Sequence, residues 1–221
     1  MAFLSNRTQT ATVGVAGPAQ APAPTAPTPA AHAFARTDTS TMDSDGTDGD
    51  AYEGPLRYLQ RQMIWQGADG VAAVANTPSV FLHGGPAGDA LTVTGGSNVL
   101  DGGGGSNFLV GADGAGPAGN TFFVDGRSGT ETWSTVVGFR QGDHLTLWGF
   151  VPGQSDLAWT DGEGTAGYAG ATLRSHLPGP GAGAPMAATF AGMTTADVQA
   201  RMTVTAGTVE GNSYLNVAFT G

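Results

Sequence analysis

A nine-residue repeat runs from Ala75 to Phe123 and constrains the fold of this chain more than any other feature. In register, the segments are ANTPSVFLH, GGPAGDALT, VTGGSNVLD, GGGGSNFLV and GADG, the last followed by a four-residue insertion and GNTFF. The eighth position is always a large apolar residue: Leu82, Leu91, Leu100, Leu109 and Phe122. A fixed short period of this kind predicts stacked turns of a solenoid, in which neighbouring repeats together bury one continuous core.

The fourth segment, GGGGSNFLV (102–110), is closest to the pattern G-G-x-G-x-D-x-U-x, in which U is a large apolar residue. On these residues the chain resembles the repeats-in-toxin family, whose nonapeptides form a calcium-binding parallel β-roll. The resemblance implies that successive nonapeptides lie on opposite sheets. Residues two repeats apart then stack, with Asp89 over Asn107 and Asn98 near Asn120.

The sixth position of the family repeat is an aspartate that helps to bind calcium, and this chain departs from it at most turns. The resemblance implies a calcium site built from sixth-position residues, nearby acids and turn glycines: Asp89, Asn98, Asp101, Gly102, Gly103, Gly105, Asn107, Gly111, Asp113 and Asn120. Calcium prefers about six to eight oxygens with negative charge, so replacing carboxylates by amides lowers the expected affinity. The alternative is that the asparagines bond to backbone groups or stack as amide ladders, and stabilise the turns without metal.

Composition limits the classes of partner. The 221 residues include 37 glycines and 13 prolines, which excludes an ordinary helical protein. The net charge is −10, and all eight basic residues are arginines, so we expect cations rather than nucleic acid or an anionic membrane as ligands. Cysteine is absent, which excludes disulfides and zinc–thiolate sites. No run of apolar residues is long enough to span a bilayer.

The expected location of the protein follows from its two ends. The opening MAFLSNRTQTATVGVAG lacks the basic start and apolar stretch of a cleaved secretory signal. The resemblance implies type I secretion instead, which reads an uncleaved carboxyl-terminal signal, and no basic residue follows Arg201. We therefore expect a secreted protein, extracellular or at the cell surface, with the type I secretion machinery as a partner.

The chain divides into four parts, and we expect an all-β fold. Residues 1–53 are predicted to be a disordered tail, rich in Pro and Ala and then acidic. Residues 54–74 are expected to cap the first turn of the roll, although PLRYLQRQMIW (55–65) also fits one or two amphipathic helical turns that bind a partner. Residues 75–123 form the roll, and residues 124–221 form a β-rich region with the secretion signal.

Two features mark the region after the repeats. Its Phe-x-x-Gly-Asp-x-apolar-x-Leu stretch, Phe139 to Leu147, resembles the roll exit of serralysin-type proteases, without the protease domain. Farther on, TTADVQARM (194–202) predicts one short helix, with Thr194 or Thr195 as N-cap and Asp197 in the first turn. The segments around it alternate in polarity and predict short strands.

Catalytic motifs are missing from the sequence. The four histidines lie far apart and none belongs to a His-Glu-x-x-His pair, and Ser134 or Ser155 beside His144 lacks a nucleophile-elbow motif. A small esterase or lyase using His144 or His176 is the weakest hypothesis, and we expect no enzyme activity. Four aromatic residues either line a carbohydrate-binding face or belong to the core: Trp133, Trp148, Phe150 and Trp159.

These observations predict a non-enzymatic, secreted, calcium-binding β-roll protein of repeats-in-toxin type, in which calcium binding is coupled to folding after export. The alternative hypothesis is a metal-independent structural or adhesive module that binds polysaccharide, a cell-surface protein or itself.

Overall fold

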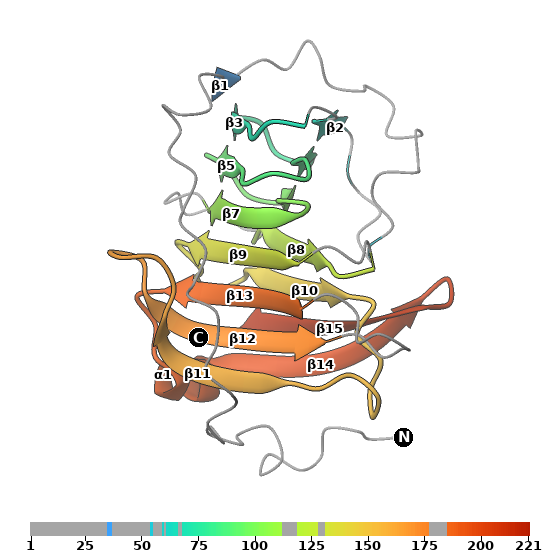
Figure 1. The fold of residues 1–221 in the computed structure, drawn as a ribbon, viewed down its shortest axis with the longest axis vertical. Helices are drawn as coiled ribbons and strands as arrows, with labels where there is room; N and C mark the ends of the chain where they lie inside the picture. Colours follow the sequence, from blue (N-terminus) through green and yellow to red (C-terminus); the bar gives the residue numbers. More distant parts are fainter. Residues whose placement is uncertain are drawn as a thin grey trace.

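The computed structural model describes residues 35–36, 54, 59, 61–65, 68–111, 119–127, 131–176 and 185–221. These residues form strands and one short helix, so the prediction of a mostly β protein with one helix is confirmed (Figure 1). The tail predicted for residues 1–53 lies outside the described residues, apart from the two residues of β1.

Two sheets make up the described body. Sheet A has the order β1 (Ala35–Arg36), β3 (Ala72–Ala75), β5 (Ala90–Val93), β7 (Gly105–Val110), β9 (Thr132–Val137), β13 (Pro185–Ala191), β12 (Gly170–His176) and β11 (Ala158–Glu163). Sheet B has the order β14 (Met202–Val209), β15 (Asn212–Phe219), β10 (His144–Trp148), β8 (Thr121–Asp125), β6 (Val99–Asp101), β4 (Val80–His83) and β2 (Arg61–Ile64).

From β2 to β10, consecutive strands alternate between the two sheets, and each strand pairs in parallel with the next strand of its own sheet. In sheet B, Leu82 is the register partner of Leu100, and Leu100 is that of Phe122. In sheet A, Leu91 is paired with Leu109. All five eighth-position side chains are buried in one core cluster between the sheets, as the nine-residue period predicts.

Antiparallel strands complete both sheets after the repeats. Strand β13 pairs in parallel with β9, and β12 and β11 then extend sheet A as antiparallel neighbours. In sheet B, β15 pairs antiparallel with β10, and β14 pairs with β15. The expected boundary between residues 123 and 124 falls inside β8, and both sheets continue across it. The two parts therefore share one core.

The single helix of the described residues, α1 (Thr195–Arg201), begins as predicted. Thr194 is the N-cap: its hydroxyl accepts from the backbone N–H of Asp197, whose carboxylate in turn accepts from the N–H of Thr194. This capping box satisfies two N–H groups that the first turn leaves without intrahelical partners. Asp161 of β11 accepts from the N–H and the hydroxyl of Thr195, and so joins the helix to sheet A.

The helical alternative for residues 55–65 is wrong where the structure describes the segment. Residues 61–64 form β2, which pairs in parallel with β4, and the N–H of Trp65 continues the pairing by donating to the carbonyl of His83. Met63 enters the core as the register partner of Leu82. Pairing with an existing sheet edge supplies the backbone hydrogen bonds that a two-turn helix in water supplies poorly.

Candidate functional site

The sixth-position residues of the repeats lie inside the body rather than at its surface. Asp89, Asn98, Asn107 and Asn120 are each 0% exposed. Asp143, which directly precedes β10, occupies the equivalent place after them and is also buried. We call Asp89 and Asn107 ladder A, and Asn98, Asn120 and Asp143 ladder B. The structure therefore brings the predicted candidates together in two rows, one per sheet.

Each ladder side chain accepts a hydrogen bond from the backbone of the preceding strand layer in its own sheet. In ladder A, Asp89 Oδ1 accepts from Val71 N at 2.6 Å, and Asn107 Oδ1 accepts from Asp89 N at 2.9 Å. The equivalent positions are linked in ladder B. Asn98 Oδ1 accepts from Val80 N at 2.9 Å, Asn120 Oδ1 from Asn98 N at 3.0 Å, and Asp143 Oδ1 from Asn120 N at 2.7 Å.

The second polar atom of most ladder side chains holds the turn to which the side chain belongs. Asp89 Oδ2 accepts from Gly85 N at 2.7 Å, and Asp143 Oδ2 accepts from Arg140 N at 3.1 Å. Asn98 Nδ2 donates to the carbonyl of Gly95 at 3.1 Å, and Asn107 Nδ2 donates to that of Gly104 at 3.2 Å. Each of these side chains therefore fixes its own turn and joins it to the layer before.

The predicted site glycines make room for this arrangement. A Cβ on Gly102 would lie 2.3 Å from Cγ of Asn107, so only glycine leaves space for the amide. Gly103 and Gly105 have φ values of 69° and 76°, in the left-handed region that favours glycine. A Cβ on Gly111 would lie 3.1 Å from the ring of Phe122. Asp113 lies outside the described residues.

The chemical groups around the ladders are not suited to binding a calcium ion. Both carboxylate oxygens of Asp89 face backbone N–H groups, which carry positive partial charge where a cation would have to lie. Asn107 presents its NH₂ group to the turn carbonyls, which are the other oxygen ligands a turn offers to calcium. Among the described residues, no three His, Asp or Glu side chains gather in a way that could hold a metal ion. Calcium binding by this chain stays a prediction, and the ladders themselves do not supply its site.

The contact between His83 and Asp101 was not predicted, although Asp101 was a predicted site residue. His83 Nδ1 lies 3.0 Å from Asp101 Oδ2, and Asp101 Oδ1 accepts from Gly103 N at 2.9 Å. Burial by itself lowers the pKa of His83, but the hydrogen bond and charge of Asp101 outweigh burial and raise that pKa above 6.5. Both residues occupy the ninth position of segments two repeats apart, and this spacing is the signal that identifies such pairs. The Asp101 carboxylate therefore already has two partners, the ring of His83 and the N–H of Gly103.

The residues considered for catalysis are not assembled. The Ser134 hydroxyl is buried, and Ser155 Oγ accepts from Val151 N. His144 lies against Asn216, and His176 pairs with Asp156 at 2.8 Å. In the described part of the chain, neither serine is hydrogen-bonded to a histidine, the partner that would activate its hydroxyl as a nucleophile.

The aromatic candidates do not form an open platform. Trp133, Trp148 and Phe150 are buried, and Trp159 packs against the main core. Trp133 donates through Nε1 to Thr189 at 3.0 Å and lies beneath the guanidinium of Arg174, which is 4.3 Å from the ring centroid. Trp148 stacks on Tyr214 in a second cluster on the outer face of sheet B. These rings therefore stabilise the fold.

Comparisons of the chain with known protein families, curated proteins and solved structures gave no match. The helix that the structure describes is too short and too polar to cross a membrane.

Proposed function

We propose that this chain is a secreted, non-enzymatic β-roll protein of the repeats-in-toxin type that acts as a structural or adhesive module. The alternation of strands between two sheets, with parallel pairing inside each sheet, supports the β-roll. A role without catalysis is supported by the buried hydroxyl of Ser134 and by Ser155 Oγ, which accepts from Val151 N rather than from a histidine.

The observation that carries the proposal is the set of hydrogen bonds made by ladders A and B. In a metal-dependent roll, sixth-position carboxylates repel one another until a cation lies between them. In this chain three of the four sixth-position residues are neutral amides, and the remaining carboxylate, Asp89, accepts hydrogen bonds from two backbone N–H groups. A buried polar group that is fully hydrogen-bonded costs little to bury. These hydrogen bonds support turns that hold without metal, although Nδ2 of Asn120 is buried with no hydrogen-bond partner.

Thermal melting with and without calcium tests this proposal. The full-length protein is melted in excess calcium and in excess chelator, with far-ultraviolet circular dichroism as the signal. We expect superimposable curves. A ligand present at a hundred times its Kd stabilises a fold by about 2.7 kcal/mol, and about 2–4 °C per kcal/mol is typical at this chain length. A calcium-dependent rise of about 5–10 °C would therefore support calcium-coupled folding instead, with the site outside the ladders.

Export is tested separately. The full-length chain is produced in bacteria beside a type I exporter, or beside the same exporter with an inactive ATPase. We expect the protein in the medium only with the active exporter, and with its amino terminus uncleaved by mass spectrometry. Protein that stays inside in both strains, or that loses an amino-terminal segment, would contradict type I secretion.

The adhesive role predicts binding that does not need calcium. Size-exclusion chromatography measures self-association, and a glycan array measures binding to polysaccharide, each in calcium and in chelator. Binding that persists in chelator supports the adhesive role. Binding that disappears when the chelator removes calcium contradicts it.

A further inference from the structure

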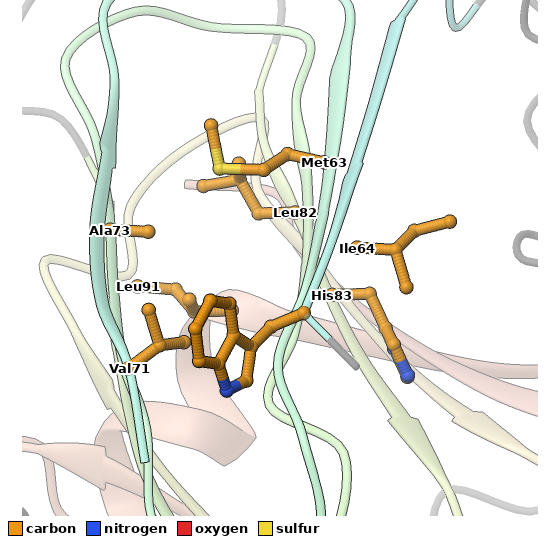
Figure 2. A pocket seen from close by; sticks show the side chains of 8 residues that line it. Met63, Ile64, Val71, Ala73, Leu82, His83 and Leu91 are labelled. Atoms are coloured by element: carbon orange, nitrogen blue, oxygen red, sulfur yellow. The ribbon is translucent and has the colours of Figure 1, made fainter. Parts of the chain in front are cut away.

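The two ends of the sheets differ in how they are finished. At the end formed by β2 and β3, Met63 and Leu82 face Ala73 and Leu91 across a small hollow (Figure 2). All four side chains are buried, so the core exposes little apolar surface there. Strand β14 lies at the opposite end of the body, as the outermost strand of sheet B (Figure 1). Among the described residues, no strand pairs with its outer edge.

Strand β14 lacks the features that usually prevent an edge strand from pairing with another chain. Charges, prolines or bulges protect most edges. The eight residues of β14, MTVTAGTV, contain no charge and no proline, and their register with β15 is unbroken. The edge strand of sheet A, β11, is protected: its register is interrupted between Thr160 and Glu163, and Asp161 between them bonds to α1. The outer edge of β14 is therefore a template for a further strand.

The pairing with β15 identifies the backbone groups that a further strand would meet. In an antiparallel ladder, successive residues bond alternately to one neighbour and to the other. The carbonyl of Arg201 accepts from the N–H of Thr220, so the odd-numbered residues of β14 face β15. The even-numbered residues face outward, and the N–H of the first, Met202, donates to Val198 of α1. The remaining outward N–H and C=O groups belong to Val204, Ala206 and Thr208.

We infer that the partner of β14 is β14 of a second copy of this chain, paired antiparallel about a twofold axis at Ala206. This register puts Ala206 opposite Ala206 and Val204 opposite Thr208, and so satisfies the outward groups of all three residues. A register centred on Val204 would instead place Thr208 of the second copy against α1. The inference rests on the adhesive role proposed above and names its partner.

Charge and side-chain shape favour this self-pairing. The residues that flank β14, Arg201 before it and Glu210 after it, are exposed and opposite in sign. Antiparallel pairing brings Arg201 of one copy close to Glu210 of the other at both ends, whereas parallel pairing would bring like charges together. Thr203 lies opposite Val209 of the second copy, and β-branched side chains pack well across strands. Because the twofold axis uses both free edges of β14, this pairing stops at a dimer.

Single cysteines test the register, because the chain has no cysteine of its own. Ala206→Cys places two thiols side by side across the axis. The Cα atoms of a hydrogen-bonded antiparallel pair lie about 5.5 Å apart, a separation that a disulfide spans. Thr203→Cys is the matched control, at an exposed position of the same strand. Its two copies would lie roughly 20 Å apart, because Thr203 faces Val209 of the second copy.

Under mild oxidation of the full-length variants, we expect an intermolecular disulfide for Ala206→Cys and little or none for Thr203→Cys. Equal yields would overturn the inference, since parallel or random association brings both positions together. No disulfide in either variant would also overturn it.

The substitution Ala206→Pro tests the pairing without cysteine. Proline is tolerated where the N–H of an edge strand points outward, but it cannot donate to a further strand. Sedimentation equilibrium should show a dimer for the wild type, and Ala206→Pro should raise its Kd by about tenfold or more because hydrogen bonds at the axis are lost. Amide exchange of Asn216, the partner of Thr205, should stay unchanged and show that the hairpin persists. Dimerisation as strong as that of the wild type, with the hairpin intact, would overturn the inference.

Melting in calcium and in chelator separates a failure of this inference from a failure of the proposed function. A monomeric wild type with superimposable melts would overturn the pairing of β14 and leave the metal-free roll intact. A dimer linked through Ala206→Cys whose melts depend on calcium would contradict the metal-free roll and support the pairing of β14.

Discussion

Asp143 accepts a hydrogen bond from the backbone N–H of Asn120 at 2.7 Å, and so ends ladder B where parallel pairing gives way to antiparallel pairing. The carbonyl of Asp143 also accepts from the N–H of Phe219 at the end of β15. Phe139, from the same Phe-x-x-Gly-Asp stretch, packs against Phe122, Phe190 and Phe219. This stretch therefore joins the repeats to the carboxyl-terminal strands of both sheets.

Asp143 predicts a pH dependence of stability. Burial raises its pKa above 3.8, and the N–H groups of Asn120 and Arg140 offset this only in part. The contribution of such a group is complete below the unfolded pKa and is lost as the pH rises through the folded pKa. The melting temperature of Asp143→Asn minus that of the wild type should therefore increase as the pH rises from about 3.8, measured by scanning calorimetry.

Asp197 is the control for this experiment, because its pKa is shifted the other way. The backbone and side-chain hydrogen bonds from Thr194 lower the pKa of this exposed carboxyl. Its contribution is present above the unfolded pKa and is lost as the pH falls through the folded pKa. For Asp197→Asn the same temperature difference should decrease as the pH rises. Equal slopes for the two variants would contradict both assignments.

The substitution Asn107→Asp tests whether ladder A tolerates a carboxylate. It replaces an NH₂ group that donates to the carbonyls of Gly103 and Gly104 by an anionic oxygen. A buried group left unpaired costs about 1–3 kcal/mol, and a charged one costs more. We expect urea melts to show this loss equally in calcium and in chelator. Asn76→Asp changes the same charge at an exposed position and should be nearly neutral. Recovery of Asn107→Asp in calcium would show that the turn accepts a cation.

His83 predicts a second pH dependence, in a higher range. Asp101, with the charges of Asp89 and Asp125, raises its pKa although burial lowers it. The resulting stability is complete below about pH 6.5 and is lost as the pH rises through the folded pKa. A nuclear magnetic resonance titration should place the pKa of His83 above 6.5, and Asp101→Asn should lower it. Asp156→Asn, beside His176, should leave the His83 titration unchanged; a shift there would refute the pairing.

Regular spacing explains which features the sequence predicts. The apolar eighth position recurs every nine residues, so the parallel stacking of Leu82 on Leu100 and of Leu91 on Leu109 follows from the period. Local capping chemistry likewise predicts helix α1 from Thr194 and Asp197. In both cases the signal lies close in sequence to the residues that it places.

Features set by distant parts of the chain were missed. Arg61–Ile64 form a strand because β4 offers a sheet edge, which the local apolar pattern does not reveal. Asp143 belongs to ladder B, but the insertion before Asn120 and the longer path to β10 break the period that would have linked it to Asn98. The pattern also suggested sixth-position side chains as ligands, since a sequence does not show whether their oxygens face N–H donors or open space.

The substitution Gly102→Ala tests whether the turn is filled by the ladder side chain. Gly102 does not have a left-handed φ, so the backbone conformation permits alanine there. The obstacle is steric, because the Cβ of the alanine would lie 2.3 Å from Cγ of Asn107. Displacing that amide breaks its bonds to Asp89 N and to the turn carbonyls, and we expect a loss of about 2–4 kcal/mol in urea unfolding.

Gly95→Ala is the matched control, because nothing lies within 4 Å of its Cβ position. Alanine there restricts the unfolded chain and should be neutral or stabilising by about 0.4–1 kcal/mol. If the turn instead kept room for an ion beside Asn107, the added methyl group of Gly102→Ala would be accommodated in chelator. Equal stabilities of the two variants in chelator would thus contradict the filled turn and, with it, the metal-free ladder.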